Sequence, residues 1–239
     1  MRRQLLLISN STLHGSGYLD HCADEITKFL GNTKSILFIP YARPNGMTYD
    51  EYTKLNSERF EKMGCKLTGI HKHDDPKKAV QSAEAIFIGG GNTFVLLEKL
   101  YKEDIIRDIR KQVDRGTLYI GSSAGSNVAC PSIKTTNDMP IIYPPSFNAL
   151  ALVPFNINPH YLDPNPNSKH MGETRETRIK EFHCYNSEYV VGLREGAILH
   201  IVNEDITLKG TTGARIFNKQ DETEEYNPGD KLDFLLKDE

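Results

Sequence analysis

Apolar residues in the first half of the chain follow two alternating patterns. Short unbroken apolar runs, which are typical of buried strands, alternate with longer segments in which apolar residues recur at helical spacing. Short connections, several of them containing Gly or Pro, separate the two kinds of segment. The predicted strands span residues 4–9, 35–39, 66–70, 85–88 and 117–122, and the predicted helices span 16–30, 49–63, 76–82, 93–101 and 104–115.

Residues at the segment ends support the predicted helices. Thr48 and Glu51 have the spacing of a capping box, and Asn92 can cap the helix that follows it. Gly31 stands where a helix commonly ends. Strands that alternate with helices pair in parallel, and the resulting sheet is covered on both faces. The pattern therefore predicts an α/β fold with a mostly parallel sheet and helices on both faces.

The second half of the chain has a different pattern. Residues 131–171 are rich in Pro and Asn and show little periodicity, and a connection of this length is typical of a functional segment. After residue 189, short strand-like runs separated by turn residues predict a C-terminal antiparallel β extension. These runs span 189–193, 197–202, 206–209 and 214–217. Residues 219–230 are polar and are expected to be mobile, and 231–236 are predicted to add an edge strand.

Length and composition fit an ordinary soluble globular protein. The chain has 239 residues, of which 26% are charged and 38% apolar, and its formal net charge is −3. No linker or shift in composition marks a boundary, so residues 1–239 are expected to form a single domain. The sequence has no basic stripe that would bind nucleic acid and no apolar run long enough to span a membrane. The N-terminal apolar run is too short for a secretory signal, which favours a cytoplasmic location.

The cysteines support the same interpretation. Cys22, Cys65, Cys130 and Cys184 lack the close paired spacing of a zinc motif and do not suggest a disulfide framework. Reduced thiols are expected, and no metal site is predicted.

The last predicted strand of the first half leads into Gly121-Ser122-Ser123-Ala124-Gly125. In a Gly-x-Ser-x-Gly pattern of this kind, a strand meets a helix at a sharp turn that has a serine at its apex. The spacing selects Ser123 as the candidate nucleophile, and the backbone N–H of Ala124 would face a developing oxyanion. Gly and Ser are also common in ordinary turns, so the pattern alone leaves a purely structural turn open.

A second glycine-rich segment, Gly89-Gly90-Gly91, follows an earlier predicted strand. Both glycine segments follow the carboxyl ends of parallel strands, where ligands of such sheets bind, so we expect them to share one crevice. Gly89–Gly91 can cradle a phosphate, serve only as a turn, or supply the N–H of Gly91 as a second oxyanion donor. The Lys-Ser/Thr of a phosphate-binding loop is absent, which favours the oxyanion interpretation over the phosphate one.

A serine nucleophile needs a base, and the chain contains 8 histidines. His71 and His73 lie in a polar stretch that is expected to be a solvated loop. His160 follows Asn158-Pro159 at the end of an apolar stretch, in a predicted rigid loop, and is the candidate base. A lone histidine is more often structural, so this choice needs further support.

Six short motifs supply that support because of their order. They are Asn10-Ser11-Thr12, Gly89-Gly90-Gly91-Asn92-Thr93, Gly121-Ser122-Ser123-Ala124-Gly125, Thr135-Thr136-Asn137-Asp138-Met139-Pro140, Asn158-Pro159-His160 and Gly172-Glu173-Thr174-Arg175. Together they closely resemble the aspartyl dipeptidase (peptidase E) family of serine exopeptidases, and the resemblance runs from about Leu5 to Gly196. One departure is Ser122, where family members often have a bulkier residue.

The resemblance implies a fold like that of class I glutamine amidotransferases and hydrolysis of dipeptides with an N-terminal aspartate. By matching motif, Ser123 is the nucleophile, His160 the general base and Asp138 the third member of the triad. Glu195 also matches a family position and is the alternative to Asp138. Asp138 is preferred because its segment is expected on the crevice side, whereas Glu195 lies in an apparent tight turn between strands. Gly91 and Ala124 would form the oxyanion hole.

The resemblance also suggests how the substrate is selected. Arg175 is its candidate for the aspartyl carboxylate, since a guanidinium binds a carboxylate with two hydrogen bonds, and Asn92 is expected to assist it. Glu173 or a backbone carbonyl is expected to bind the free α-amino group. The alternative is that the charged residues at 173–178 form an exposed, salt-bridged helix face.

The function expected from the sequence is therefore that of a serine dipeptidase that needs no metal or cofactor. Its partner is a small peptide substrate, and the chain is expected to be a monomer or homodimer. Two other functions stay open: another hydrolase on the same fold, such as an esterase, acyl transferase or cyanophycinase-like enzyme, and a non-catalytic module that binds a small anion.

Overall fold

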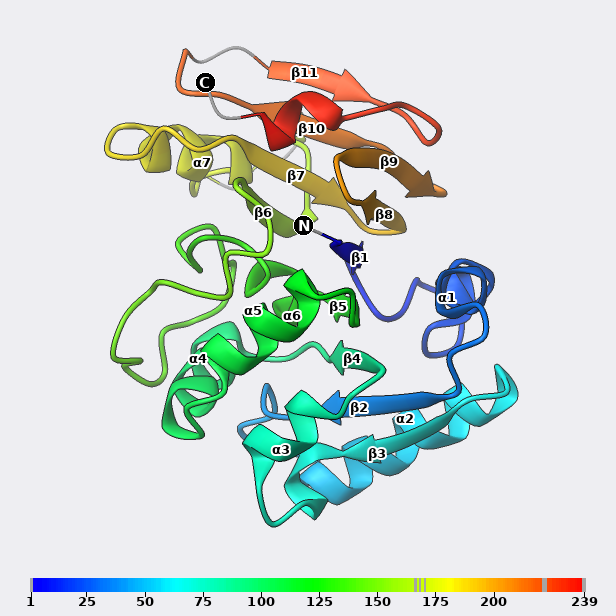
Figure 1. Ribbon diagram of the computed structural model, residues 1–239. Coiled ribbons are helices and arrows are strands. Elements are labelled where there is room, and N and C mark those ends of the chain that lie inside the picture. Colours follow the sequence, from blue (N-terminus) through cyan, green and yellow to red (C-terminus); the bar gives the residue numbers. More distant parts are fainter. Residues whose placement is uncertain (1, 166, 168, 170, 221–222, 238–239) are drawn as a thin grey trace.

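A seven-stranded sheet runs through the centre of the protein (Figure 1). The structure is a computed structural model, and it describes residues 2–165, 167, 169, 171–220 and 223–237. The strand order is β3-β2-β4-β5-β1-β8-β9; the first five strands in this order pair in parallel, and β8 and β9 are antiparallel. The strands are β1 (Gln4–Ile8), β2 (Ser35–Ile39), β3 (Lys66–Gly69), β4 (Ala85–Ile88), β5 (Leu118–Ser122), β8 (Ala197–Val202) and β9 (Asp205–Gly210).

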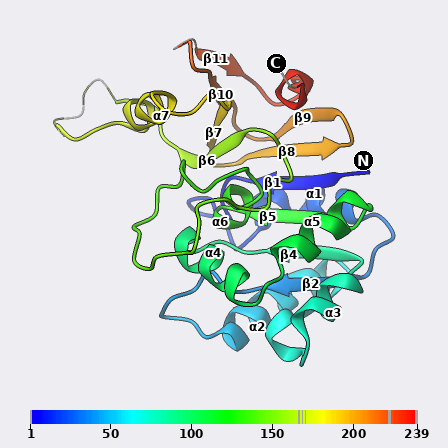
Figure 2. The same ribbon diagram turned by 60° about the vertical axis from the view of Figure 1, so that its left-hand side comes forward.

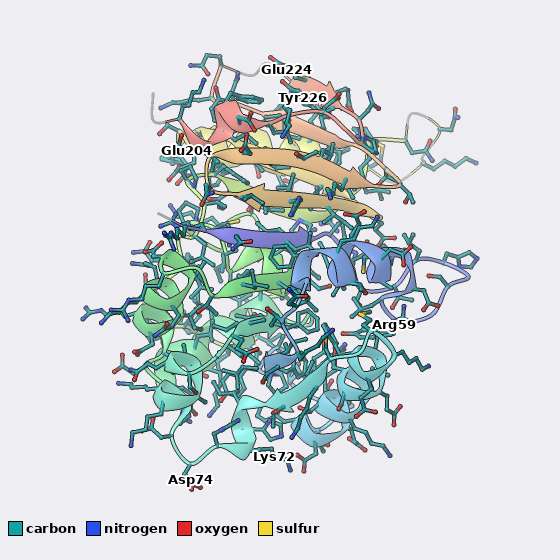
Figure 3. The ribbon with its side chains drawn as sticks, turned by 45° about the vertical axis from the view of Figure 1, so that its right-hand side comes forward. Arg59, Lys72, Asp74, Glu204, Glu224 and Tyr226 are labelled. Atoms are coloured by element: carbon teal, nitrogen blue, oxygen red, sulfur yellow. The ribbon has the colours of Figure 1, made fainter. Side chains whose placement is uncertain are left out.

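Helices cover both faces of this sheet, because alternate strand residues point to opposite faces. In β1, the side chains of Leu5 and Leu7 enter one apolar core, while Leu6 and Ile8 enter the other. Helices α1 and α2 pack on the second core, and α3, α4 and α5 pack on the first; in Figure 3, α1 and α2 lie to the right of the sheet. The helices are α1 (Ala23–Leu30), α2 (Tyr49–Lys62), α3 (Pro76–Gln81), α4 (Thr93–Lys102), α5 (Ile106–Asp114), α6 (Ala124–Asn127) and α7 (Arg175–His183).

Arg59 joins α2 to η1 (Asp20–Cys22), a 3-10 helix of one turn that precedes α1 (Figure 3). Its guanidinium lies 2.8 Å from a carboxylate oxygen of Asp20 and donates to the carbonyl of Leu19 at 3.1 Å. These contacts fix the loop between β1 and α1 against the helix on the same side of the sheet.

A second, four-stranded sheet lies beside β8 and β9, with α7 next to it (Figure 2). Its order is β11-β10-β7-β6, in which β6 and β7 are parallel and the other pairs antiparallel. The strands are β6 (Asn156–Tyr161), β7 (Val190–Arg194), β10 (Ala214–Phe217) and β11 (Thr223–Tyr226). Strand β7 leads through a short turn at Glu195 and Gly196 into β8 of the first sheet, so this turn joins the two sheets.

The predicted α/β fold, with a mostly parallel sheet and antiparallel C-terminal strands, is confirmed. The predicted capping box is present: Glu51 N–H donates to Thr48 Oγ1 at 3.2 Å, and Thr48 N–H donates to the Glu51 carboxylate at 2.8 Å. The prediction of one helix over 16–30 was wrong in its first part, because Leu19 takes a left-handed conformation with φ 56° and the α-helix begins only at Ala23.

Three further differences lie in the second half of the chain. Residues 156–161 form strand β6 and not a loop, because their backbone pairs in parallel with β7. The side-chain N–H groups of Asn156 and Asn158 donate to the carbonyls of Ser132 and Thr135. The polar stretch 219–230 contains β11. Residues 231–236 do not add an edge strand; apart from a bridge at Lys231, they lead into the 3-10 turn η3 (Asp233–Leu236).

Replacing the buried Ser126 with alanine should destabilise the fold and leave the protein surface unchanged. The buried hydroxyl lies 2.7 Å from the carbonyl of Ile8 and 2.9 Å from that of Gly121, so it ties α6 to β1 and β5. Its loss should lower the free energy of unfolding by about 1–3 kcal/mol, measured by urea denaturation. Ser57→Ala on α2 is the matched control and should change it by less than about 0.5 kcal/mol; equal effects would contradict this role for Ser126.

Candidate active site

Ser123 stands at the apex of the turn between β5 and α6, in a strained backbone conformation. Its φ and ψ are 54° and −110°, outside the regions that side-chain-bearing residues prefer. The turn is tight: a Cβ on Gly121 would lie 2.5 Å from the carbonyl oxygen of Gly125, and one on Gly125 would lie 2.1 Å from that of Ile88. The N–H of Ser123 donates to Ile8 at 3.0 Å, which holds the apex at the end of β1. The turn between β5 and α6 therefore has the geometry expected of a nucleophile elbow.

His160 lies near the end of β6, with its imidazole directed at this serine. Its Nε2 is 2.9 Å from Ser123 Oγ. The β6–β7 register shifts between Pro159 and Tyr161, and His160 itself has φ 52°, so a local bulge turns this side chain out of the strand. The sequence places Ser123 and His160 far apart, and the fold brings them into hydrogen-bond contact.

Glu195 lies on the other side of the imidazole. Its Oε1 is 2.7 Å from His160 Nδ1. Two contacts fix the turn that carries it: Gly196 N–H donates to Asn10 Oδ1 at 2.8 Å, and Thr212 Oγ1 donates to the Glu195 carbonyl at 2.6 Å. The result is a continuous chain of hydrogen bonds from the Ser123 hydroxyl through His160 to a carboxylate.

The expectation that Asp138, and not Glu195, lies against His160 needs correction. The Asp138 carboxylate accepts hydrogen bonds from the Thr93 N–H at 2.7 Å, the Thr93 hydroxyl at 2.6 Å and the Thr136 hydroxyl at 3.2 Å. It is thus bound to the first turn of α4. The apparent tight turn at Glu195 joins the two sheets, and this position brings its carboxylate to the histidine.

The backbone around His160 is held by residues that sequence reasoning did not select. Ser9 accepts a hydrogen bond from the His160 N–H at 2.9 Å and donates its own hydroxyl to the Leu193 carbonyl at 2.8 Å. Asn137 donates to the carbonyl of Pro159 at 2.6 Å. Asn137 lies inside one of the six sequence motifs, and this membership could have identified it as a site residue. Ser9 lies just before another motif.

The two expected oxyanion donors belong to segments that meet at the serine: Ala124 follows it directly, and Gly91 is in the loop that contacts it. A Cβ on Gly90 would be 3.1 Å from the Cβ of Ser123, so the Gly89–Gly91 loop touches the elbow. Gly91 has φ 143°, and a Cβ there would lie 2.2 Å from the carbonyl oxygen of Ala42. Among the residues that the structure describes, the N–H groups of Gly91 and Ala124 have no hydrogen-bond acceptor. Both donors are free to bind a developing oxyanion.

Arg175 is the first residue of α7 and differs from the charged residues around it. Glu173 lies 3.6 Å from Arg178, and Glu176 lies 3.4 Å from Lys180, so these residues form the expected salt-bridged helix face. Arg175 is half-buried and, within the described part of the chain, has no ion pair. Burial and the charge of Arg178 lower the pKa of Arg175, whereas the charge of Asp138 raises it. Arg175 is thus an available cation near Asp138.

The other two expected substrate residues already have partners. Asn92 accepts from Val95 N–H at 3.1 Å and donates one amide hydrogen to the Met139 carbonyl at 2.9 Å. One N–H of its side chain stays available. Glu173 is paired with Arg178, so a substrate ammonium would have to compete with that guanidinium.

The described residues contain no group of three or more His, Cys, Asp or Glu side chains arranged to hold a metal ion. The helices described also include none that combines the length and the apolarity of a membrane span.

Comparisons with known proteins agree with the resemblance seen in the motifs. Residues 5–209 match the sequence model of Peptidase family S51. A Drosophila melanogaster protein named "Probable alpha-aspartyl dipeptidase" is 48% identical over 238 residues, which cover 98% of each chain. Peptidase E of Streptomyces coelicolor is 46% identical over 232 residues, covering 97% of this chain and 94% of its own.

A solved structure shows the same fold. The crystal structure of a peptidase from an acI-B1 Actinobacterium is 17% identical, covers 97% of both chains and has a TM-score of 0.75, a likeness of fold alone. The family match covers most of the chain, and the two sequence relatives align nearly end to end. The chain therefore belongs to peptidase family S51.

Proposed function

We propose that this peptidase is a serine exopeptidase that hydrolyses dipeptides with an N-terminal aspartate. One observation carries the catalytic part of the proposal: His160 bridges Ser123 Oγ at 2.9 Å and Glu195 Oε1 at 2.7 Å. The same relation of nucleophile, base and orienting acid defines serine hydrolases on unrelated folds. The names of the Drosophila and Streptomyces relatives support the substrate class.

The reaction follows from the direction of these hydrogen bonds. His160 Nε2 accepts the hydroxyl proton as Ser123 Oγ attacks the scissile carbonyl carbon. Glu195 accepts the Nδ1–H of His160, which fixes the tautomer and stabilises the imidazolium. The imidazolium then gives its proton to the leaving amine, and the C–N bond breaks to leave an aspartyl ester on Ser123. Water, activated by His160, attacks this ester, and the serine regains its proton.

The N–H groups of Gly91 and Ala124 bind the carbonyl oxygen as negative charge develops on it. One donor comes from the loop after β4 and the other from the start of α6. Both are held by the backbone, so they need little reorganisation during the reaction.

Arg175 is the proposed partner of the substrate's aspartyl carboxylate. It is half-buried and lacks an ion pair within the described chain. A substrate carboxylate can therefore bind the guanidinium without displacing a protein carboxylate, and each charge then has a partner of opposite sign. Asp138 supports this arrangement in two ways: it fixes the first turn of α4, and its charge opposes the loss of the Arg175 proton. The remaining amide hydrogen of Asn92 and the carboxylate of Glu173 are proposed as secondary contacts.

Ser123→Ala should remove activity and leave the fold intact. Without the hydroxyl no acyl-enzyme forms, so kcat for Asp-Leu should fall by roughly 10³-fold or more. Ser122→Ala is the matched control, because the neighbouring hydroxyl is buried and lacks a hydrogen-bond partner; its kcat should stay within about threefold of wild type.

A panel of Asp-X, Glu-X, longer peptides and esters, run on wild type and Ser123→Ala, also separates a dipeptidase from other hydrolases. Near-normal turnover by Ser123→Ala would refute the proposed nucleophile.

Glu195→Gln and Asp138→Asn should have different effects. Glu195→Gln removes the acceptor for His160 Nδ1–H, so kcat for Asp-Leu should fall by roughly 10²- to 10⁴-fold with little loss of stability. Asp138→Asn should lower the free energy of unfolding by about 1–3 kcal/mol through its contacts with Thr93, while kcat falls by less than about tenfold. Steady-state kinetics and urea denaturation measure the two effects. The reverse pattern would assign the orienting role to Asp138.

Arg175→Met should reduce recognition of aspartate and not catalysis in general. Loss of a charge-assisted carboxylate contact should lower kcat/KM for Asp-Leu by roughly 10- to 100-fold and leave the slow hydrolysis of Ala-Leu almost unchanged. Lys180→Met, which removes an exposed charge from the same helix, is the control and should change both values little. If Asp-Leu and Ala-Leu lose equally in Arg175→Met, this arginine does not select the substrate.

A further inference from the structure

Arg43 is a second arginine near the candidate site, and the motifs that define the family do not include it. It follows Ala42 in the loop after β2, and the Ala42 carbonyl accepts the Asn92 N–H at 2.8 Å. A Cβ on Gly91 would lie 2.2 Å from the same carbonyl oxygen. The backbone that carries Arg43 is therefore in direct contact with the loop that presents the Gly91 oxyanion donor.

The side chain of Arg43 extends along the same loop. Its guanidinium carbon lies 4.4 Å from the centre of the Tyr52 ring, and the Tyr52 hydroxyl donates to the Gly90 carbonyl at 3.2 Å. Gly90 in turn touches Ser123, since a Cβ on Gly90 would be 3.1 Å from the serine Cβ. One tyrosine ring and one glycine thus separate the guanidinium from the nucleophile.

The loop between β1 and α1 approaches the same tyrosine. Tyr18 of that loop donates its hydroxyl to Asn56 at 3.0 Å and lies 3.5 Å from the Tyr52 hydroxyl. Burial and the neighbouring Tyr52 raise the pKa of Tyr18, while the charge of Arg43 lowers it. The loop also contains Asn10, which fixes the turn of Glu195.

The guanidinium of Arg43 stacks on Tyr52 and has no carboxylate partner in the described part of the chain. Over the described residues, Arg43 forms no ion pair with a carboxylate, and its Nε is shielded from solvent without a hydrogen-bond acceptor. A shielded guanidinium nitrogen without an acceptor is costly. The terminal nitrogens of Arg43 are not among the buried atoms and make no hydrogen bond to the described residues, so they can bind an anion. Stacking on Tyr52 leaves the edge of the guanidinium available for such a ligand.

A dipeptide supplies an anion close to its scissile bond. The leaving residue carries the free α-carboxylate, and its Cα is about 3.8 Å from that of the aspartyl residue across the scissile peptide. When the scissile carbonyl oxygen lies at Gly91 and Ala124, this carboxylate lies within a few ångströms of the elbow. Arg175 already accounts for the aspartyl side chain, which leaves the α-carboxylate as the group without a partner.

We propose that Arg43 binds the C-terminal α-carboxylate of the substrate, so that this enzyme selects dipeptides with a free carboxyl end. This inference rests on the proposed function and deepens it. The site then has one cation for each carboxylate of Asp-X: Arg175 for the side chain and Arg43 for the chain end. Longer peptides and C-terminal amides lack a carboxylate at that position and should bind more weakly.

The test compares Asp-Leu with Asp-Leu amide in wild type and in Arg43→Met. We expect wild type to prefer the free acid, and Arg43→Met to raise KM for Asp-Leu by roughly 10- to 100-fold with kcat changed by less than about threefold. KM for Asp-Leu amide should stay within about threefold, so the preference disappears. Arg43→Lys should restore part of it, because an ammonium keeps the charge without the planar fork. Arg107→Met, on the exposed face of α5, is the matched control and should change neither value.

Each other outcome overturns the inference. Equal losses on Asp-Leu, Asp-Leu amide and Ala-Leu would make Arg43 a structural residue that only stacks on Tyr52. Equal losses on both Asp substrates with none on Ala-Leu would mean that Arg43 binds the aspartyl side chain. Failure of the proposed function looks different, because wild type would then not hydrolyse Asp-Leu or Ser123→Ala would retain that activity.

Discussion

Three consecutive residues at the end of strand β1 hold the three groups of the candidate triad. The Ile8 carbonyl accepts the N–H of Ser123, the Ser9 hydroxyl accepts the N–H of His160, and the Asn10 side chain accepts the N–H of Gly196 beside Glu195. This strand lies between β5 and β8, so it contacts both the elbow and the turn that joins the sheets. The geometry of the site depends on this shared anchor.

The anchor also explains how the strain at the site persists. Ser123 and His160 both have positive φ values, 54° and 52°, which cost free energy for residues with a side chain. Such conformations persist only when the surrounding structure determines them. Here the backbone of each residue is hydrogen-bonded to the end of β1, and glycines at 121 and 125 leave room for the sharp turn. The hydroxyl and the imidazole meet because two strained turns are fixed to one strand.

Periodicity and turn chemistry were enough to predict the first half of the fold. Unbroken apolar runs gave the parallel strands, and local signals such as the Thr48–Glu51 capping box gave helix starts that the structure contains. Strand β6 escaped this reasoning because its Asn, Pro and His residues lack an apolar pattern. The side-chain N–H groups of its buried Asn156 and Asn158 donate to the carbonyls of Ser132 and Thr135, which are distant in sequence.

The elbow could be predicted because its chemistry is local, whereas the orienting acid could not. Asp138 and Glu195 both match the family's motifs, and the choice between them depends on which loop the sheets bring to His160. The connection between β7 and β8 decides it, and no local feature of the Arg194-Glu195-Gly196 sequence reveals that this turn joins two sheets. Arg43 shows the same limit, since only its contact with Tyr52 beside Gly90 places it near the nucleophile.

The most direct test is a crystal structure of Ser123→Ala with Asp-Leu bound. We expect His160 Nδ1 within hydrogen-bond distance of the Glu195 carboxylate, Nε2 facing the scissile amide, and the carbonyl oxygen at the N–H groups of Gly91 and Ala124. An imidazole paired with Asp138, or a substrate carbonyl directed away from these N–H groups, would contradict the mechanism.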